Sequence, residues 1–151
     1  VVLRNVLFRL PAKVDARAMP WVTYTDPELA HVGLDEAAAR ARHGAIRILR
    51  WPFSENDRAQ AERRIDGLVK VIATPRGRVL GASIVGVQAG ELIQPWVLAI
   101  GQGLKVSALA QMIAPYPTRG EASKRTAGTF YTPKLFSERT KWLVRLLARL
   151  G

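Results

Sequence analysis

The chain has 151 residues, of which 48% are hydrophobic and 23% are charged, a composition typical of one compact globular domain. It contains no cysteine, which excludes disulfides, thiolate catalysis and cysteine-ligated metal sites within this segment. Two histidines, His31 and His43, are too few for a histidine-rich metal site, and we expect no bound metal. No apolar run approaches the roughly 20 residues that span a bilayer, and no signal peptide is recognisable at the start. We therefore expect a cytoplasmic protein and, because the chain begins with Val1, a fragment of a longer one.

The net charge of +11 permits attraction to nucleic acid, anionic membranes or acidic partners. The arginines are scattered along the chain, and they are not clustered with a stacking platform for bases. This pattern favours an ordinary solvated surface, so no nucleic-acid partner is expected. A stand-alone basic module that binds nucleic acid or an anionic membrane remains the alternative function.

The first third of the chain predicts a lead-in, a strand and a helix. Residues 1–18 form a lead-in or linker from a preceding domain. Residues 21–25 are rich in β-branched and aromatic side chains, which favours a strand, and Pro27 ends it because proline lacks an N–H donor. Residues 34–43 place acidic side chains first and basic side chains last, as the helix dipole favours, and Gly44 is a natural stop.

The middle third predicts three more strands. Residues 45–51 alternate between apolar and basic side chains, which indicates a half-buried strand. Residues 52–66 are polar and form either a short helix or an ordered loop. The clearest strand patterns are at 68–74 and 78–85, and the Pro-Arg-Gly sequence at 75–77 suits a tight turn between them.

The last third is predicted to be helical. An apolar stripe runs through residues 89–102, with Pro95 near the first turns or at a kink. Residues 106–113 predict a second, short helix. Two prolines bracket Tyr116, so the segment around this tyrosine cannot be helical.

Two further helices complete the predicted elements. Thr118 and Glu121 have the spacing of a capping box, which predicts a helix to about Phe130. A last helix opens at Ser137, with apolar side chains on one face and basic side chains on the other. We expect its apolar face to pack on the domain or across a dimer; contact with an anionic membrane is the alternative. Strands and helices are segregated, which predicts an α+β domain with a small, mainly antiparallel sheet and helices on one side.

Three stretches of the sequence resemble a known family. They are Val22-Thr-Tyr-Thr-Asp-Pro-Glu-Leu-Ala30 followed by Val32-Gly33; Gly67-Leu-Val-Lys70 with Leu80-Gly-Ala82 and Ala89-Gly-Glu-Leu-Ile93; and Ala114-Pro-Tyr-Pro-Thr-Arg-Gly-Glu121. In this order and spacing they are similar to the C-terminal dimerisation domain of the pyridine nucleotide-disulfide oxidoreductases, such as dihydrolipoamide dehydrogenase, glutathione reductase and mercuric reductase. The resemblance assigns residues 19–131 to that domain and leaves residues 132–151 as a C-terminal amphipathic helix.

The resemblance implies a homodimeric enzyme that uses FAD and NAD(P)H. In such enzymes the redox cysteines lie in the FAD domain, which accounts for their absence here. This segment alone would bind neither cofactor and would not be active. The resemblance also implies that the Pro-Thr tip of one subunit, here Pro117 and Thr118, reaches the flavin of the other. The FAD and nicotinamide domains of the same parent chain would be further partners.

The sequence departs from the family at the position of the acid/base histidine, where it has Tyr116, and at an earlier histidine, where it has Ala114. The glutamate that orients the histidine is retained as Glu121. We therefore predict Tyr116 and Glu121 as catalytic, and Tyr116, Pro117 and Thr118 as cofactor contacts. The alternatives are that Tyr116 only fixes a turn and that Glu121 only caps a helix. An unperturbed tyrosine has a pKa of about 10, against about 6.5 for histidine, so Tyr116 is a poor base at neutral pH.

This departure makes a mercuric-reductase-like or uncharacterised oxidoreductase the favoured subfamily. The resemblance also implies a C-terminal cysteine pair in mercuric reductases, which residues 146–151 lack, so mercury reduction is not supported. We expect His31 to lie at the surface or to lead into a helix, and His43 to lie at a helix C-terminus. The glycines at 81, 86 and 90 are interpreted as strand and turn glycines, because no βαβ setting for a dinucleotide loop surrounds them.

Overall fold

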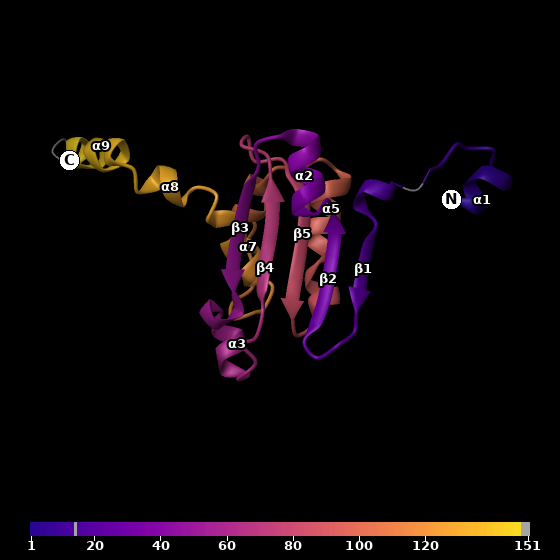
Figure 1. Ribbon diagram of the computed structural model, residues 1–151, viewed down its shortest axis with the longest axis horizontal. Coiled ribbons are helices and arrows are strands. Elements are labelled where there is room, and N and C mark those ends of the chain that lie inside the picture. The colour runs from indigo at the N-terminus through magenta and orange to yellow at the C-terminus, as the bar shows by residue number, and fades with distance from the viewer. Residues whose placement is uncertain (14, 149–151) are drawn as a thin grey trace.

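The computed structural model describes residues 1–13 and 15–148. Its centre is a five-stranded antiparallel sheet with the strand order β1-β2-β5-β4-β3 (Figure 1). The strands are β1 (Pro20–Thr23), β2 (Glu28–Gly33), β3 (Arg47–Pro52), β4 (Leu68–Ala73) and β5 (Val79–Gly86). The α+β fold with an antiparallel sheet, predicted from the sequence, is confirmed.

Strand β2 is the one strand that the sequence analysis missed. Its side chains alternate: Ala30 and Val32 are fully buried on one face, whereas Leu29 and His31 are half-buried on the other. This period of two is typical of a strand. His31 lies within β2 and is half-buried, so the prediction that it leads into a helix is wrong.

The helices are short and flank the sheet. They are α1 (Val2–Val6), α2 (Glu36–His43), α3 (Asp57–Ala61), α4 (Ala89–Leu92), α5 (Gln94–Gly101), α6 (Val106–Ala110), α7 (Glu121–Gly128), α8 (Thr132–Leu135) and α9 (Glu138–Leu147), with single turns η1 (Ala16–Ala18) and η2 (Phe53–Glu55). Pro95 stands in the first turn of α5 and separates it from α4, as expected. The polar stretch 52–66 contains a short helix, α3, rather than only a loop.

The main core lies between the sheet and the helices α4 to α7, which Figure 1 shows behind the sheet. Trp96 of α5 and Ile84 of β5 are fully buried there. The indole Nε1 of Trp96 donates a hydrogen bond to Ser123 Oγ at 3.0 Å, which ties α5 to α7. On the other face, α2 covers one end of the sheet and buries a smaller cluster around Ile72 and Leu80. His43 is the last residue of α2, as predicted.

Two arms leave the domain on opposite sides: the segment that carries α1 next to β1, and the segment that carries α8 and α9 next to β3 (Figure 1). Helices α1 and α8 bury none of their residues. Phe8 of the first arm and Trp142 of the second are 67% and 64% exposed. Val144 and Leu147 of α9 are 58% and 56% exposed, so packing of its apolar face across a dimer stays a prediction.

Candidate active site at the Tyr116 loop

Tyr116, Pro117 and Thr118, three of the residues predicted as the site, lie on the loop between α6 and α7, residues 111–120, which we call the Tyr116 loop. It is at the same end of the molecule as α3, because its residues contact that helix. Thr118 Oγ1 donates a hydrogen bond to the Pro115 carbonyl oxygen at 2.8 Å, which closes the loop into a tight turn. Pro117 and Tyr116 form the exposed tip, and Tyr116 is 68% exposed. The ring of Tyr116 is therefore accessible at the tip of the loop.

A buried asparagine joins the loop to α3. Asn56 is 2% exposed and is the N-cap of α3, where its Oδ1 accepts a hydrogen bond from the Ala59 amide at 3.0 Å. Its Nδ2 donates to the Thr118 carbonyl oxygen at 3.0 Å. The Asn56 side chain thus caps the start of α3 and bonds the backbone of the Tyr116 loop, so the two segments hold a fixed relative position.

A buried arginine makes the second connection. Arg119 is 5% exposed; its Nε donates to Glu62 Oε2 at 2.8 Å and its Nη2 to the Arg64 carbonyl oxygen at 3.0 Å. The guanidinium carbon lies 5.7 Å from the centre of the Phe53 ring. Hydrogen bonds from Arg58, and then from Arg119, hold the pKa of the Glu62 carboxyl below its usual value. Arg119, which follows Thr118 directly, therefore links the Tyr116 loop to the C-terminal end of α3.

The Tyr116 hydroxyl donates a hydrogen bond to Asp57 Oδ2 at 2.6 Å. Asp57 is the first residue of α3. The hydrogen bond to this carboxylate and its negative charge raise the pKa of Tyr116 above its ordinary value of 10.0, because ionising the phenol would place two negative charges together. Tyr116 is therefore a protonated hydrogen-bond donor at neutral pH, and its charged partner is Asp57, which the sequence analysis did not single out.

Glu121 occupies a different position from the one predicted. It begins α7, and its Oε1 accepts a hydrogen bond from Arg125 Nε at 2.9 Å and forms an ion pair with Arg125 Nη2 at 2.8 Å. Among the described residues its carboxylate makes no hydrogen bond to Tyr116. The predicted capping box is wrong: the N-cap of α7 is Gly120, and the Thr118 hydroxyl bonds the Pro115 carbonyl instead.

The histidines are remote from the loop. His31 lies on the sheet face opposite α4 to α7, with Nδ1 2.9 Å from Ser83 Oγ and Nε2 3.2 Å from the Gly33 carbonyl oxygen. Its ring packs beside Trp21, with 5.5 Å between ring centres. In residues 1–13 and 15–148, His, Asp and Glu side chains form no group of three or more that could hold a metal ion. None of the helices described there is long and apolar enough to cross a membrane.

Residues 19–127 match the model of the pyridine nucleotide-disulphide oxidoreductase dimerisation domain, and the chain belongs to this family. The resemblance inferred from three motifs is thereby confirmed. The dihydrolipoyl dehydrogenase of Bacillus subtilis is 36% identical over 118 residues, which cover 78% of this chain and 25% of that protein. The mercuric reductase of Bacillus cereus is 35% identical over 128 residues, covering 84% of this chain and 20% of that protein.

Solved structures show the same fold. LpdA of Mycobacterium tuberculosis superposes with a TM-score of 0.77 at 28% identity, over 85% of this chain and 28% of that one. RclA of Escherichia coli, described as a flavoprotein disulfide reductase induced by HOCl, gives a TM-score of 0.78 at 26% identity, over 85% of this chain and 30% of that one. The chain spans about a quarter of the length of the curated relatives given above.

Proposed function

We propose that this chain is the interface domain of a homodimeric, FAD-dependent NAD(P)H oxidoreductase and that its Tyr116 loop completes the flavin site of the partner subunit. The observation that carries the proposal is the exposed tyrosine ring at the tip of a loop whose base is hydrogen-bonded to neighbouring segments. Asn56 bonds the Thr118 carbonyl and Arg119 bonds Glu62 and Arg64, while the exposed Tyr116 ring is held by the hydrogen bond from its hydroxyl to Asp57. A loop whose base is fixed and whose polar tip is exposed is suited to placing one side chain in a site on another chain.

The loop fits a flavin that another chain or domain holds. Tyr116 and Pro117 are exposed, so a planar ring can reach them without rearrangement of the core. When bound, FAD supplies the capacity to accept a hydride from NAD(P)H and to pass electrons to an acceptor. The contribution of this chain is to place a hydrogen-bond donor, the Tyr116 hydroxyl, beside that chemistry and to keep it protonated.

The raised pKa of Tyr116 decides which role the residue takes. A phenol that accepts no proton at neutral pH cannot replace the histidine base that the family resemblance implies for thiol exchange. Its single O–H bonds Asp57 in this structure, so it donates a hydrogen bond or a proton to the acceptor only by exchanging that bond, whereas its oxygen stays free to accept one. We therefore propose an oxidoreductase in which a tyrosine binds or protonates the electron acceptor. Asp57 positions the Tyr116 phenol for that role.

Exposed apolar side chains near the loop support a dimer. Ile113, within the Tyr116 loop, is 93% exposed, and Leu98 of α5 is 61% exposed. Obligate dimer interfaces bury on the order of 2,000 Å² or more, and such side chains are the ones they cover. A partner that covers this helical side would also receive the loop.

The experiment is the substitution Tyr116→Phe in the full-length, FAD-bound protein. Acceptor turnover is expected to fall on the order of 100-fold, because a donated proton or hydrogen bond is lost. FAD content and the rate at which NAD(P)H reduces the flavin should be unchanged. Tyr24→Phe is the matched control, because Tyr24 is 80% exposed in the β1–β2 turn. Equal turnover in both variants would remove the catalytic role of Tyr116.

A further inference from the structure

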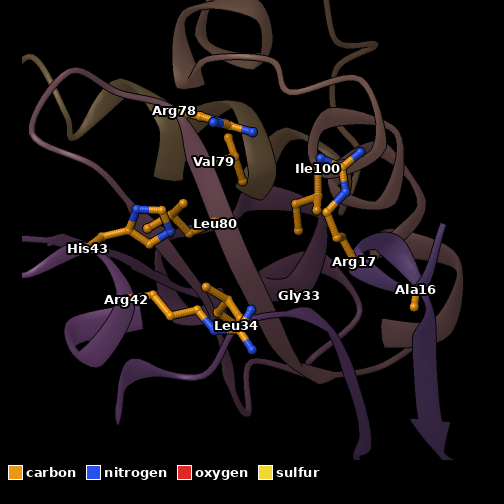
Figure 2. Close-up of a pocket in the computed structure, with 10 residues that line it drawn as sticks. All are labelled: Ala16, Arg17, Gly33, Leu34, Arg42, His43, Arg78, Val79, Leu80 and Ile100. Atoms are coloured by element: carbon orange, nitrogen blue, oxygen red, sulfur yellow. The ribbon is translucent and has the colours of Figure 1, made fainter. Parts of the chain in front are cut away.

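A cavity of about 490 Å³ lies at the end of the sheet opposite the Tyr116 loop (Figure 2). The start of β5 lines this cavity, whereas the last residue of β5, Gly86, lies against Phe53 next to α3. The other walls come from the turn η1, the end of β2, the C-terminus of α2 and α5. Its volume is within the range of about 300–1,000 Å³ that small-molecule sites occupy.

The floor of the cavity is apolar. Leu80 and Ile100, which are each 7% exposed, contribute to it together with Leu34. These side chains come from three different elements and are held in place by the core beneath them. An aliphatic or aromatic group can therefore bury its surface there without a change in the fold.

The rim of the cavity is cationic. Arg17 lines it from η1, Arg42 and His43 line it from α2, and Arg78 lines it from the position just before β5, as Figure 2 shows. None of the residues lining the cavity is acidic. Arg17 is neutralised by Asp15, with Nη2 2.7 Å from Oδ2 and Nε 2.9 Å from Oδ1. Arg42 and Arg78 have no ion pair with any residue in the described part of the chain, so two guanidinium charges are left uncompensated.

The helix dipole accounts for only part of this arrangement. Arg42 and His43 occupy the C-terminal turn of α2, where a basic side chain is stabilised in any case. Arg78 belongs to a different segment, after the β4–β5 turn, and its place in the lining of the same cavity does not follow from that dipole. Two guanidinium groups from separate elements match a dianion better than a single carboxylate, since a phosphoryl group carries a charge of about −1.5 to −2 and three acceptor oxygens.

We propose that this cavity binds a small phosphorylated molecule with an apolar body. The phosphoryl group accepts hydrogen bonds from Arg42 and Arg78, and the apolar part lies on the floor formed by Leu34, Leu80 and Ile100. Arg17 reaches the same ligand from η1, so binding ties the lead-in segment to the sheet. This site is separate in the fold from the Tyr116 loop and does not depend on the role proposed for it.

The test uses phenyl phosphate as a probe with the full-length, FAD-bound protein and measures affinity by calorimetry. Arg42→Ala and Arg78→Ala should each weaken binding about tenfold, because each removes a charge-assisted hydrogen bond. Arg76→Ala is the matched control: Arg76 is an exposed arginine in the same β4–β5 turn but does not line the cavity. Its affinity should stay within about twofold of the wild type. Arg78→Lys, which keeps the charge but not the planar fork, should bind at an intermediate level.

Phenol tests the apolar floor alone, and inorganic phosphate tests the cationic rim alone. Each should bind more weakly than phenyl phosphate. Hydrogen exchange at residues 15–18 should slow when phenyl phosphate is bound. The proposal is overturned if no phenyl phosphate binds, if the two alanine variants bind as tightly as Arg76→Ala, or if phenol binds equally well. Binding that survives both alanine substitutions would report a nucleotide site elsewhere in the parent chain, which also contradicts the proposal.

Discussion

Tyr116 and Asp57 are 59 positions apart in the sequence, and their contact shows how a surface residue acquires a defined chemical state. The phenol is exposed, so burial contributes little to its ionisation. The main cause of its raised pKa is the hydrogen bond to the Asp57 carboxylate, followed by the charge of that carboxylate. Stabilisation of the neutral phenol is fully present below the ordinary tyrosine pKa of about 10 and is lost as pH rises through the higher pKa of the folded state.

Asp57→Asn is therefore expected to lower the pKa of Tyr116 towards its ordinary value, because the amide no longer opposes ionisation. In the full-length protein the alkaline limb of acceptor turnover should move to lower pH, while the neutral plateau changes less. The readout is the pH profile, with Glu55→Gln as control, since Glu55 is an exposed carboxylate two positions away in η2. Identical alkaline limbs in the two variants would show that Asp57 does not position or tune Tyr116.

Arg119 is expected to be the main anchor of the loop. Arg119→Ala should lower the free energy of unfolding by about 2 kcal/mol, because a buried side chain and its hydrogen bonds are removed together. Arg119→Met keeps the packing over Phe53 and should cost less. Urea denaturation measures both. Arg125→Ala, at a position whose side chain is 56% exposed, should change stability little; a similar loss there would mean that Arg119 has no special role.

At the scale of elements, the tight contact between β5 and the segment after β2 depends on a glycine. A Cβ at Gly81 would lie against the backbone carbonyl of Leu34, which cannot move aside as a flexible side chain would. Gly128, at the end of α7, has nothing within 4 Å of the corresponding position. Only Gly81 is therefore required to be small, although sequence alone does not distinguish the two glycines.

Gly81→Ala is expected to reduce the free energy of unfolding by about 2 kcal/mol through overpacking against the backbone. Gly128→Ala should leave stability unchanged or raise it by roughly 0.5 kcal/mol, because alanine loses less entropy in a helix. Thermal denaturation of the two variants side by side measures the difference. A Gly81→Ala variant as stable as Gly128→Ala would contradict the close approach between β5 and Leu34.

Local patterns were enough to predict the β4–β5 hairpin and the break at Pro95, because a turn and a missing N–H donor act over a few residues. They were enough for the position of the Tyr116 loop, since two prolines exclude a helix. They did not predict Asp57 or Arg119 as parts of the site, because those contacts join α3 to a loop far along the chain. Local sequence patterns carry no information on contacts between such distant residues, which only the fold brings together.

At the scale of the whole molecule, the domain has a complete core but leaves apolar surface unpartnered. The two arms expose Phe8 and Trp142, and the helical side exposes Ile113. These features suit a segment that is buried in a larger dimeric protein better than a stand-alone basic module. The net charge of +11 is then a property of the remaining surface and of the cationic cavity in Figure 2.

The most direct measurement is a crystal structure of the full-length protein with FAD bound. The account predicts two subunits clasped through this domain, with the Tyr116 hydroxyl of each within hydrogen-bonding reach of the partner's flavin site and Asp57 still holding it. A structure in which the Tyr116 loop faces solvent, with no second subunit against that side, would contradict the account.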